Sequence, residues 1–148
     1  MANTKHSLHA THVLEFPFKR SVGPVLGRFF TALRDEQKFL GARTQEGQVI
    51  VPPQEYDASG QPIEDLVEVG PGGEIVSWTW VPRPRPKAPL AHAFAWALIR
   101  LDGADVPIVH AIDAGDASRL AIGARVRPRW VEEPQGSILD VSCFELEA

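Results

Sequence analysis

The residues of this chain best suited to metal chemistry are its five histidines and its single cysteine. His6, His9 and His12 recur at every third position, and on a helix this spacing would gather imidazoles for a metal ion. No carboxylate accompanies them at ligand spacing, and the neighbouring sequence does not anchor a helix. We therefore expect a polar terminus here rather than a metal site.

The residue types of a nucleophilic triad are present in Cys143, His110 and Asp113, but no nucleophile elbow or comparable motif frames them. Cys143 lies in the apolar run 138–146, where it is expected to pack as a small hydrophobic side chain. His92 and His110 also lie in apolar runs, where a hydrogen-bonded or rim position is the expected outcome. The sequence thus predicts no catalytic residue.

Two further patterns carry no catalytic signal. Glu132 and Glu133 precede Pro134 and indicate a solvated turn, and the loop 70–73 lacks the lysine and following helix of a phosphate-binding loop. The single cysteine excludes an internal disulfide and any multi-cysteine metal site within one chain.

A basic, proline-rich stretch at 81–89 is the concentrated positive patch of the sequence, and its alternating prolines favour an extended polyproline conformation. Its cations suit the phosphates of a coenzyme A held by a neighbouring subunit. They would equally suit the phosphates of nucleic acid if nearby aromatic side chains stacked on its bases. The candidate aromatic residues are Trp78, Trp80, Phe94 and Trp96, and the candidate phosphate contacts are Arg83, Arg85 and Lys87. Alternatively, these aromatics fill a barrel or face a protein.

The composition of the chain limits the number of domains it can form and the kinds of partner it can attract. With 148 residues and 44% hydrophobic content, the chain fits one domain, or one domain with a small appendage. A net charge of −4 and a pI near 5.7 give no global attraction to nucleic acid or anionic membranes. The apolar stretch Ala88–Ile99 is too short to span a bilayer, and the N-terminus lacks signal-peptide features, so we expect a cytoplasmic protein.

A helix is predicted over Pro24–Phe39, where apolar residues recur at helical spacing and Gly41 supplies a stop. Strand patterns follow at 66–69, 74–81, 91–101, 106–112, 124–131 and 138–146, which fit a closed barrel or a sandwich. Asp102–Gly103 marks a tight hairpin turn. Simple alternation from Glu74 places Ile75, Ser77, Thr79 and Val81 on one face, and Val76, Trp78 and Trp80 on the other.

Several short motifs recur in a characteristic order: Leu14–Phe18, Phe29–Leu33, Val51–Pro53, Val76–Trp80, Trp96–Gly103 and Ile122–Val126. In this order the chain resembles the family of domain of unknown function 35, which joins a rubredoxin-like zinc ribbon to an OB barrel. The resemblance implies a mainly β fold, a five-stranded OB barrel preceded by an N-terminal helix and a degenerate ribbon. It divides the chain into an extension and docking helix (1–40), a ribbon segment (41–65) and the barrel (66–148).

Family members place Cys-x-x-Cys knuckles on either side of the paired prolines. The corresponding positions in this chain are Arg43 and Glu46, then Tyr56 and Ser59. These side chains do not replace thiolates on structural zinc, so the resemblance implies no metal here. We expect glycine turns, prolines, a pairing of Arg43 with Glu46 and a neighbouring protein to hold the ribbon instead.

Members of the family accompany thiolase-superfamily enzymes, and this chain resembles the metal-free partners of lipid-transfer-protein-like aldolases of steroid side-chain breakdown. The resemblance implies a non-catalytic subunit that forms a heterotetramer with its enzyme. The substrate of the complex is then a β-hydroxyacyl-CoA, and the chain itself binds no cofactor. Expected docking residues are Phe16, Phe18, Phe29, Phe30 and Leu33. Candidate acyl-CoA or phosphate contacts are Arg83, Arg85, Lys87, Trp78, Trp80 and Trp96.

Three alternatives stay open at the level of sequence. In the first, the chain is still an accessory subunit, but its partner enzyme is a thiolase or an acyl-CoA hydratase. In the second, the chain binds single-stranded nucleic acid. In the third, the chain is itself an enzyme that acts on acyl-CoA.

Overall fold

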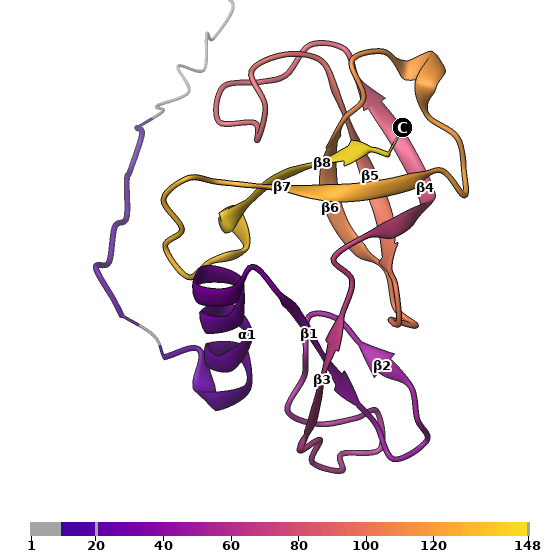
Figure 1. Cartoon of the computed structure of the whole chain (residues 1–148). Helices are drawn as coiled ribbons and strands as arrows, with labels where there is room; N and C mark the ends of the chain where they lie inside the picture. Colours follow the sequence, from indigo (N-terminus) through magenta and orange to yellow (C-terminus); the bar gives the residue numbers. More distant parts are fainter. Residues whose placement is uncertain (1–9, 20, 148) are drawn as a thin grey trace, which may run out of the picture.

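The computed structural model describes residues 10–19 and 21–147. One α-helix is followed by a small sheet and a barrel (Figure 1). The elements before the barrel are α1 (Gly23–Glu36), β1 (Phe39–Arg43), β2 (Val49–Ile50) and β3 (Asp65–Val69). The barrel segment contains β4 (Gly73–Val81), β5 (Phe94–Leu101), β6 (Ile108–Asp113), η1 (Ala117–Arg119), β7 (Arg125–Trp130), η2 (Ile138–Asp140) and β8 (Val141–Leu146).

Helix α1 begins beside Pro24, which suits the first turn, and buries Phe29, Ala32 and Leu33. It ends earlier than the sequence predicts, because Gln37 adopts a left-handed conformation with φ 55°. This reversal releases Phe39 into β1, where its side chain is fully buried.

The small sheet has the order β2-β1-β3, with both pairings antiparallel. Gly41 lies inside β1 and does not stop the helix; a Cβ there would meet Val49 Cγ1 at 2.6 Å and Val51 Cγ2 at 3.2 Å. The close approach of these side chains therefore requires glycine. The strand predicted at 66–69 pairs with β1 in this sheet and is not a barrel strand, because its partners run from Phe39 to Arg43.

The barrel is closed in the order β4-β5-β6-β8-β7, with β7 pairing back onto β4. All pairs are antiparallel except β6 with β8, where Ile112 lies opposite Phe144. Its interior is filled by alternate residues of the strands, among them Ile99, Leu101 and Val126. This arrangement confirms the prediction of a mainly β, five-stranded OB barrel behind an N-terminal helix.

A β-bulge between Ile75 and Ser77 reverses the predicted alternation along β4. The extra residue shifts the phase, so Trp78 and Trp80 pack against the core on the same side as Ile75. Small partners on β5 leave room for the two indoles, since Trp78 lies opposite Ala97 and Trp80 opposite Ala95.

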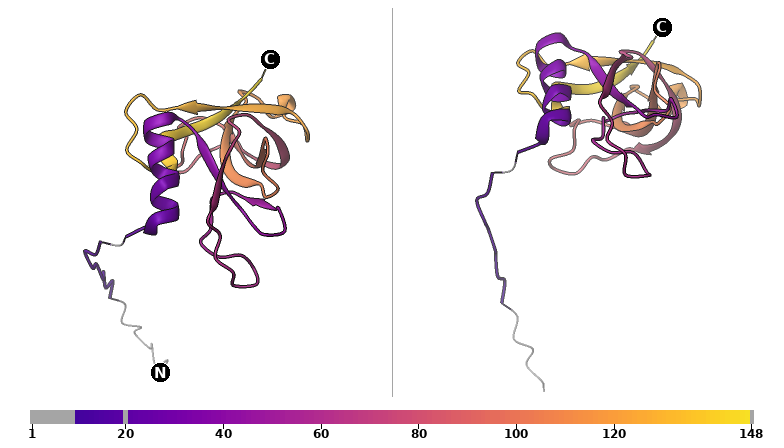
Figure 2. Two further views of the ribbon diagram at one scale, coloured as in Figure 1. Left: turned by 60° about the horizontal axis from the view of Figure 1, so that its bottom comes forward. Right: turned by 90° about the horizontal axis from the view of Figure 1, so that it is seen from below.

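Helix α1 contacts both β1 and the loop between β7 and β8, and so joins the small sheet to the barrel (Figure 1). Residues 10–19 run extended away from this body, as Figure 2 shows. Within the described residues, no helix combines the length and apolar character needed to cross a membrane.

Candidate functional site

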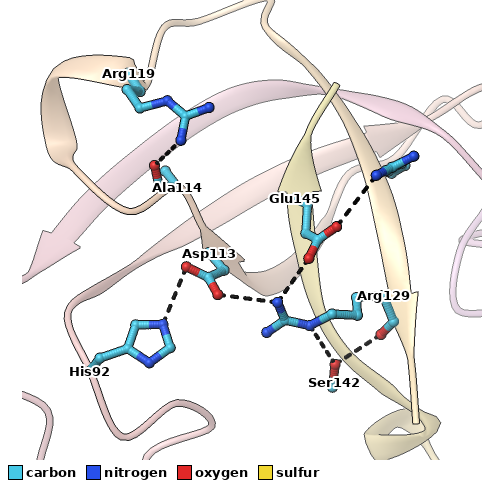
Figure 3. Close-up of polar contacts among 8 residues, drawn as sticks. His92, Asp113, Ala114, Arg119, Arg129, Ser142 and Glu145 are labelled. Atoms are coloured by element: carbon cyan, nitrogen blue, oxygen red, sulfur yellow. Dashed lines mark hydrogen bonds and ion pairs between the residues drawn. The ribbon is translucent and has the colours of Figure 1, made fainter. Parts of the chain in front are cut away.

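A network of ion pairs lies on the outer surface of β6, β7 and β8 (Figure 3). Arg129 Nη1 contacts Asp113 Oδ2 at 3.2 Å and Glu145 Oε1 at 2.8 Å. Asp113 Oδ1 also receives His92 Nε2 at 3.2 Å, from the loop before β5. Burial alone would raise the pKa of Asp113, but its bonds to His92 and Arg129 outweigh burial and leave that pKa below its usual value. The paired charges join the loop to the barrel, and the Asp113 carboxylate is held in its ionised form.

The triad considered from the sequence does not assemble. Asp113 contacts His92 rather than His110, and the Cys143 side chain is fully buried. Burial raises the pKa of the Cys143 thiol, which disfavours a nucleophilic thiolate. The expectation that Cys143 packs as a small hydrophobic residue is confirmed by its contacts in a buried cluster with Leu90 and Phe94.

The two histidines that the sequence places in apolar strands differ, because only His110 lies in a strand, β6, whereas His92 lies in the loop before β5. His92 is an exposed rim residue, as predicted. His110 is buried against Phe144, with ring centroids 5.4 Å apart, and its Nδ1 has no hydrogen-bond partner. The prediction of a hydrogen-bonded histidine is thus wrong for this nitrogen, although backbone groups of Ala111 and Ile138 lie close enough to act on the ring. Burial lowers the pKa of His110, so its neutral form is favoured.

Of the N-terminal histidines, His12 is exposed, whereas His6 and His9 lie outside the described residues. Across residues 10–19 and 21–147, no three His, Cys, Asp or Glu side chains converge on a point where a metal ion would sit.

Two of the four ribbon positions that correspond to lost zinc ligands, Arg43 and Ser59, have side-chain partners within the chain. Arg43 Nε contacts Asp65 Oδ2 at 3.3 Å, so the predicted pairing with Glu46 is wrong: Asp65 lies directly opposite Arg43 in the β1–β3 register. Ser59 Oγ donates to Asp57 Oδ1 at 2.7 Å, and Tyr56 is exposed. The Asp57 carboxylate also accepts the backbone amides of Ser59 and Gln61, so this turn is held by hydrogen bonds within itself.

The expected docking surface on α1 is smaller than predicted. Phe29 and Leu33 are buried in the core of this chain, so they are not available to a partner. Phe30 is partly buried against the same core. In the N-terminal segment, by contrast, Phe16 and Phe18 are 71% and 81% exposed.

We use the term cationic loop for residues 82–89, between β4 and β5. Arg83, Arg85 and Lys87 are exposed and form no ion pair with the described acidic residues. The predicted extended conformation is interrupted by a turn, in which Ala88 N donates to Arg85 O at 3.1 Å and Lys87 has φ 71°. This turn presents the cations to solvent.

The predicted aromatic platform is divided by the barrel wall. Trp78 and Trp80 point toward the core, Phe94 is buried, and Trp96 is 38% exposed on the outer face. Trp96 meets Phe94 edge-on at 5.5 Å between centroids. Four aromatic rings are therefore not available together for base stacking.

Trp96 borders a groove of about 200 Å³, which we call the barrel-face groove. It lies over β4, β5 and β6, and its lining residues are uncharged: Ser77, Trp78, Thr79, Trp96, Ala97, Leu98 and Val109.

Sequence reasoning missed the ion pairs of β7. Arg125, Arg127 and Arg129 alternate along this strand, a period-2 signal that places all three on its outer face. Arg125 donates two hydrogen bonds to Asp102, at 2.6 and 2.5 Å, and thereby ties β7 to the β5–β6 turn. The alternation was readable in the sequence, but the acidic partners come from distant strands.

Comparison with known proteins gives one family match: residues 66–131 match the model described as the ChsH2 C-terminal OB-fold domain. No curated protein matches the chain in sequence. Among solved structures, a DUF35-family protein of unknown function from Sulfolobus solfataricus aligns with a TM-score of 0.61 and 21% identity, over 84% of this chain and 83% of that chain. The Ltp2-ChsH2(DUF35) aldolase aligns with a TM-score of 0.60 and 14% identity, over 86% of this chain and 97% of that chain.

Proposed function

Since the barrel of this chain belongs to the family of ChsH2 C-terminal OB-fold domains, we propose that the protein is a non-catalytic accessory subunit of a thiolase-like acyl-CoA aldolase. The observation that carries the proposal is a fold shared over most of its length with a chain of the Ltp2-ChsH2(DUF35) aldolase. The buried Cys143 and the mutually paired Asp113, Arg129 and Glu145 support a non-catalytic role.

In this proposal the enzyme subunit cleaves a β-hydroxyacyl-CoA by a retro-aldol reaction, with a sterol side chain as the acyl group. Two copies of each subunit form a cytoplasmic heterotetramer. The present chain stabilises the enzyme and shapes the entrance for the coenzyme A thioester, which is a substrate of the complex.

Docking is assigned to the exposed aromatic side chains of the N-terminal segment, Phe16 and Phe18, together with the accessible part of Phe30. Burial of a large apolar side chain contributes about 1.5–3 kcal/mol, so two phenylalanines supply a substantial part of a binding energy.

The cationic loop is assigned to the phosphates of coenzyme A. Arg83, Arg85 and Lys87 have no acidic partner among the described residues, so a phosphate would not have to displace one. Charge-assisted bonds from Arg and Lys to phosphate are among the stronger hydrogen bonds in proteins.

Co-expression with each thiolase-superfamily enzyme of the same genome tests the proposal. We expect one of them to co-purify with the chain at equal stoichiometry and to lose solubility or activity without it. Separate purification of a soluble, fully active enzyme in every case would contradict the proposal, as would acyl-CoA turnover by the isolated chain. Co-purification with a true thiolase or a hydratase would retain the accessory role and change the reaction.

A further inference from the structure

The outer face of β4, β5 and β6 is built from side chains that line up across the strands. One row joins Ser77, Leu98 and Val109, and the next joins Thr79, Trp96 and Ala111. Both rows point away from the barrel interior, since their neighbours along β5, such as Ala97 and Ile99, face the core. The apolar surface therefore continues across three strands.

The chain itself covers one half of this face. The end of the cationic loop and the residue that follows it, Leu90, cross this half. Leu90 packs in a buried cluster with Phe94, Ala111 and Cys143, and Ala88 lies alongside. The cover is an irregular, uncharged segment that inserts one aliphatic side chain next to a proline, Pro89. This contact shows which kind of chain the face accommodates.

The other half of the face has no such cover. Trp96, Leu98 and Val109 are 38%, 36% and 63% exposed, and they border the barrel-face groove. The groove volume of about 200 Å³ accommodates one large apolar side chain.

The charged residues in the rows that flank these two rows are paired with one another. Arg100 binds Glu74 in the row beyond Leu98, and His92 binds Asp113 at the covered end. An occupant with a net charge would therefore find no unpaired opposite charge in these flanking rows, and its desolvation there would be uncompensated. The occupant that complements this surface is uncharged.

The hydroxyl groups of Ser77 and Thr79 border the groove and suit the amide groups of a peptide backbone. A hydrocarbon chain has no groups to bond them. The two hydroxyl groups beside the groove thus favour a polypeptide over an acyl chain as its occupant.

We propose that the barrel-face groove is a second docking site for the enzyme subunit, which places an extended, uncharged segment across β4–β6 and inserts one large apolar side chain beside Trp96, Leu98 and Val109. This inference rests on the proposed function and adds to it a surface separate from Phe16 and Phe18. It also assigns Trp96 to protein contact rather than to a nucleobase.

The test measures the affinity of the purified chain for the enzyme identified by co-expression, using isothermal titration calorimetry. The variants Val109→Glu and Thr79→Glu each place a carboxylate in the groove, at exposed positions that the fold tolerates. The matched control is Ile122→Glu, because Ile122 is 75% exposed and lies outside the groove. We expect at least tenfold weaker binding for both groove variants, and less than a twofold change for the control.

Three results would overturn the inference while leaving the proposed function intact. The first is equal affinity of all three variants for the enzyme. The second is binding of octanoyl-CoA to the isolated chain that Val109→Glu abolishes, which would assign the groove to an acyl chain. The third is dimerisation of the isolated chain that the same variant abolishes, which would assign it to a second copy. Failure of the unmodified chain to bind any enzyme would instead refute the proposed function, and this inference with it.

Discussion

The buried carboxylate of Asp140 accepts a hydrogen bond from the backbone amide of Gly136 at 2.8 Å. The same carboxylate accepts the amides of Gln135 at 2.8 Å and Ser137 at 3.2 Å. A Cβ at Gly136 would contact Arg34 of α1 at 3.8 Å, so the loop that Asp140 organises is the part of the barrel on which the helix rests.

Replacement of Asp140 by alanine leaves three amides of this loop without their acceptor. We expect the free energy of unfolding to fall by about 2–4 kcal/mol, because hydrogen bonds to a buried charged group are strong and their donors become unsatisfied. Urea denaturation measures the loss. The exposed Glu132→Ala serves as control and should change stability by no more than about 0.5 kcal/mol; an equal effect of the two variants would contradict this role of Asp140.

His110 predicts a loss of stability in mild acid. Its pKa is lowered by burial from the ordinary 6.5, so the unfolded chain binds the proton first as pH falls. The contribution of neutral His110 is therefore complete above about pH 6.5 and decreases below it, by up to about 1.4 kcal/mol per pH unit.

The measurement is urea denaturation at pH 5.5 and 7.5 for the unmodified chain and for His110→Leu. Removal of the unpartnered Nδ1 should flatten the pH dependence and leave stability at pH 7.5 unchanged or higher. His12→Gln, at an exposed site, should leave the slope as it is. A slope that survives in His110→Leu would assign the acid sensitivity to other groups.

The bulge in β4 predicts losses of stability of different size for substitutions at two adjacent residues. Trp78 packs on the core although simple alternation along the strand places it with Val76, so Trp78→Ala should cost about 2–3 kcal/mol by thermal unfolding. Thr79→Ala, on the outer face, should cost less than about 0.5 kcal/mol. Similar losses for both would argue against the bulge.

Exposed phenylalanines predict a variant that impairs assembly without destabilising the chain. Phe16→Ser combined with Phe18→Ser should weaken binding to the enzyme by at least tenfold and leave the unfolding midpoint of the isolated chain unchanged, because neither ring packs on the core. Leu139→Ser is the matched control, since Leu139 is 73% exposed on the barrel. Pull-down and calorimetry measure the affinity for the enzyme of the Phe16/Phe18 variant and of the Leu139 control.

The cationic loop predicts an effect on substrate affinity. Replacing Arg83, Arg85 and Lys87 by glutamine should raise the KM of the complex for its acyl-CoA about tenfold and leave kcat within twofold, since the loop would contact phosphates remote from the reacting carbons. The control is Arg127→Gln, on the exposed face of β7. An unchanged KM would leave the loop without a role in coenzyme A binding.

The sequence alone was sufficient for the elements with regular periodicity. The apolar run predicted as a strand at 91–101 contains β5, Phe94–Leu101, and the run predicted at 74–81 is almost the whole of β4, Gly73–Val81. The order of motifs likewise led to the OB barrel and its family. Candidate site residues were predicted less well. Apolar residues at helical spacing, such as Phe29 and Leu33, are equally typical of a face that docks to a partner and of a face that packs in the core of the chain itself.

Tertiary structure decided the features that depend on pairing between distant residues. The bulge after Ile75 arises from the register of β4 against β5, and it turns two tryptophans inward. The partner of Arg43 is Asp65 because β1 lies beside β3, and that of Arg129 is Asp113 because β6 and β7 both flank β8. A local pattern records how apolar residues are spaced along the chain, whereas ion pairs, bulges and open grooves are fixed only when closure of the barrel brings separate strands together.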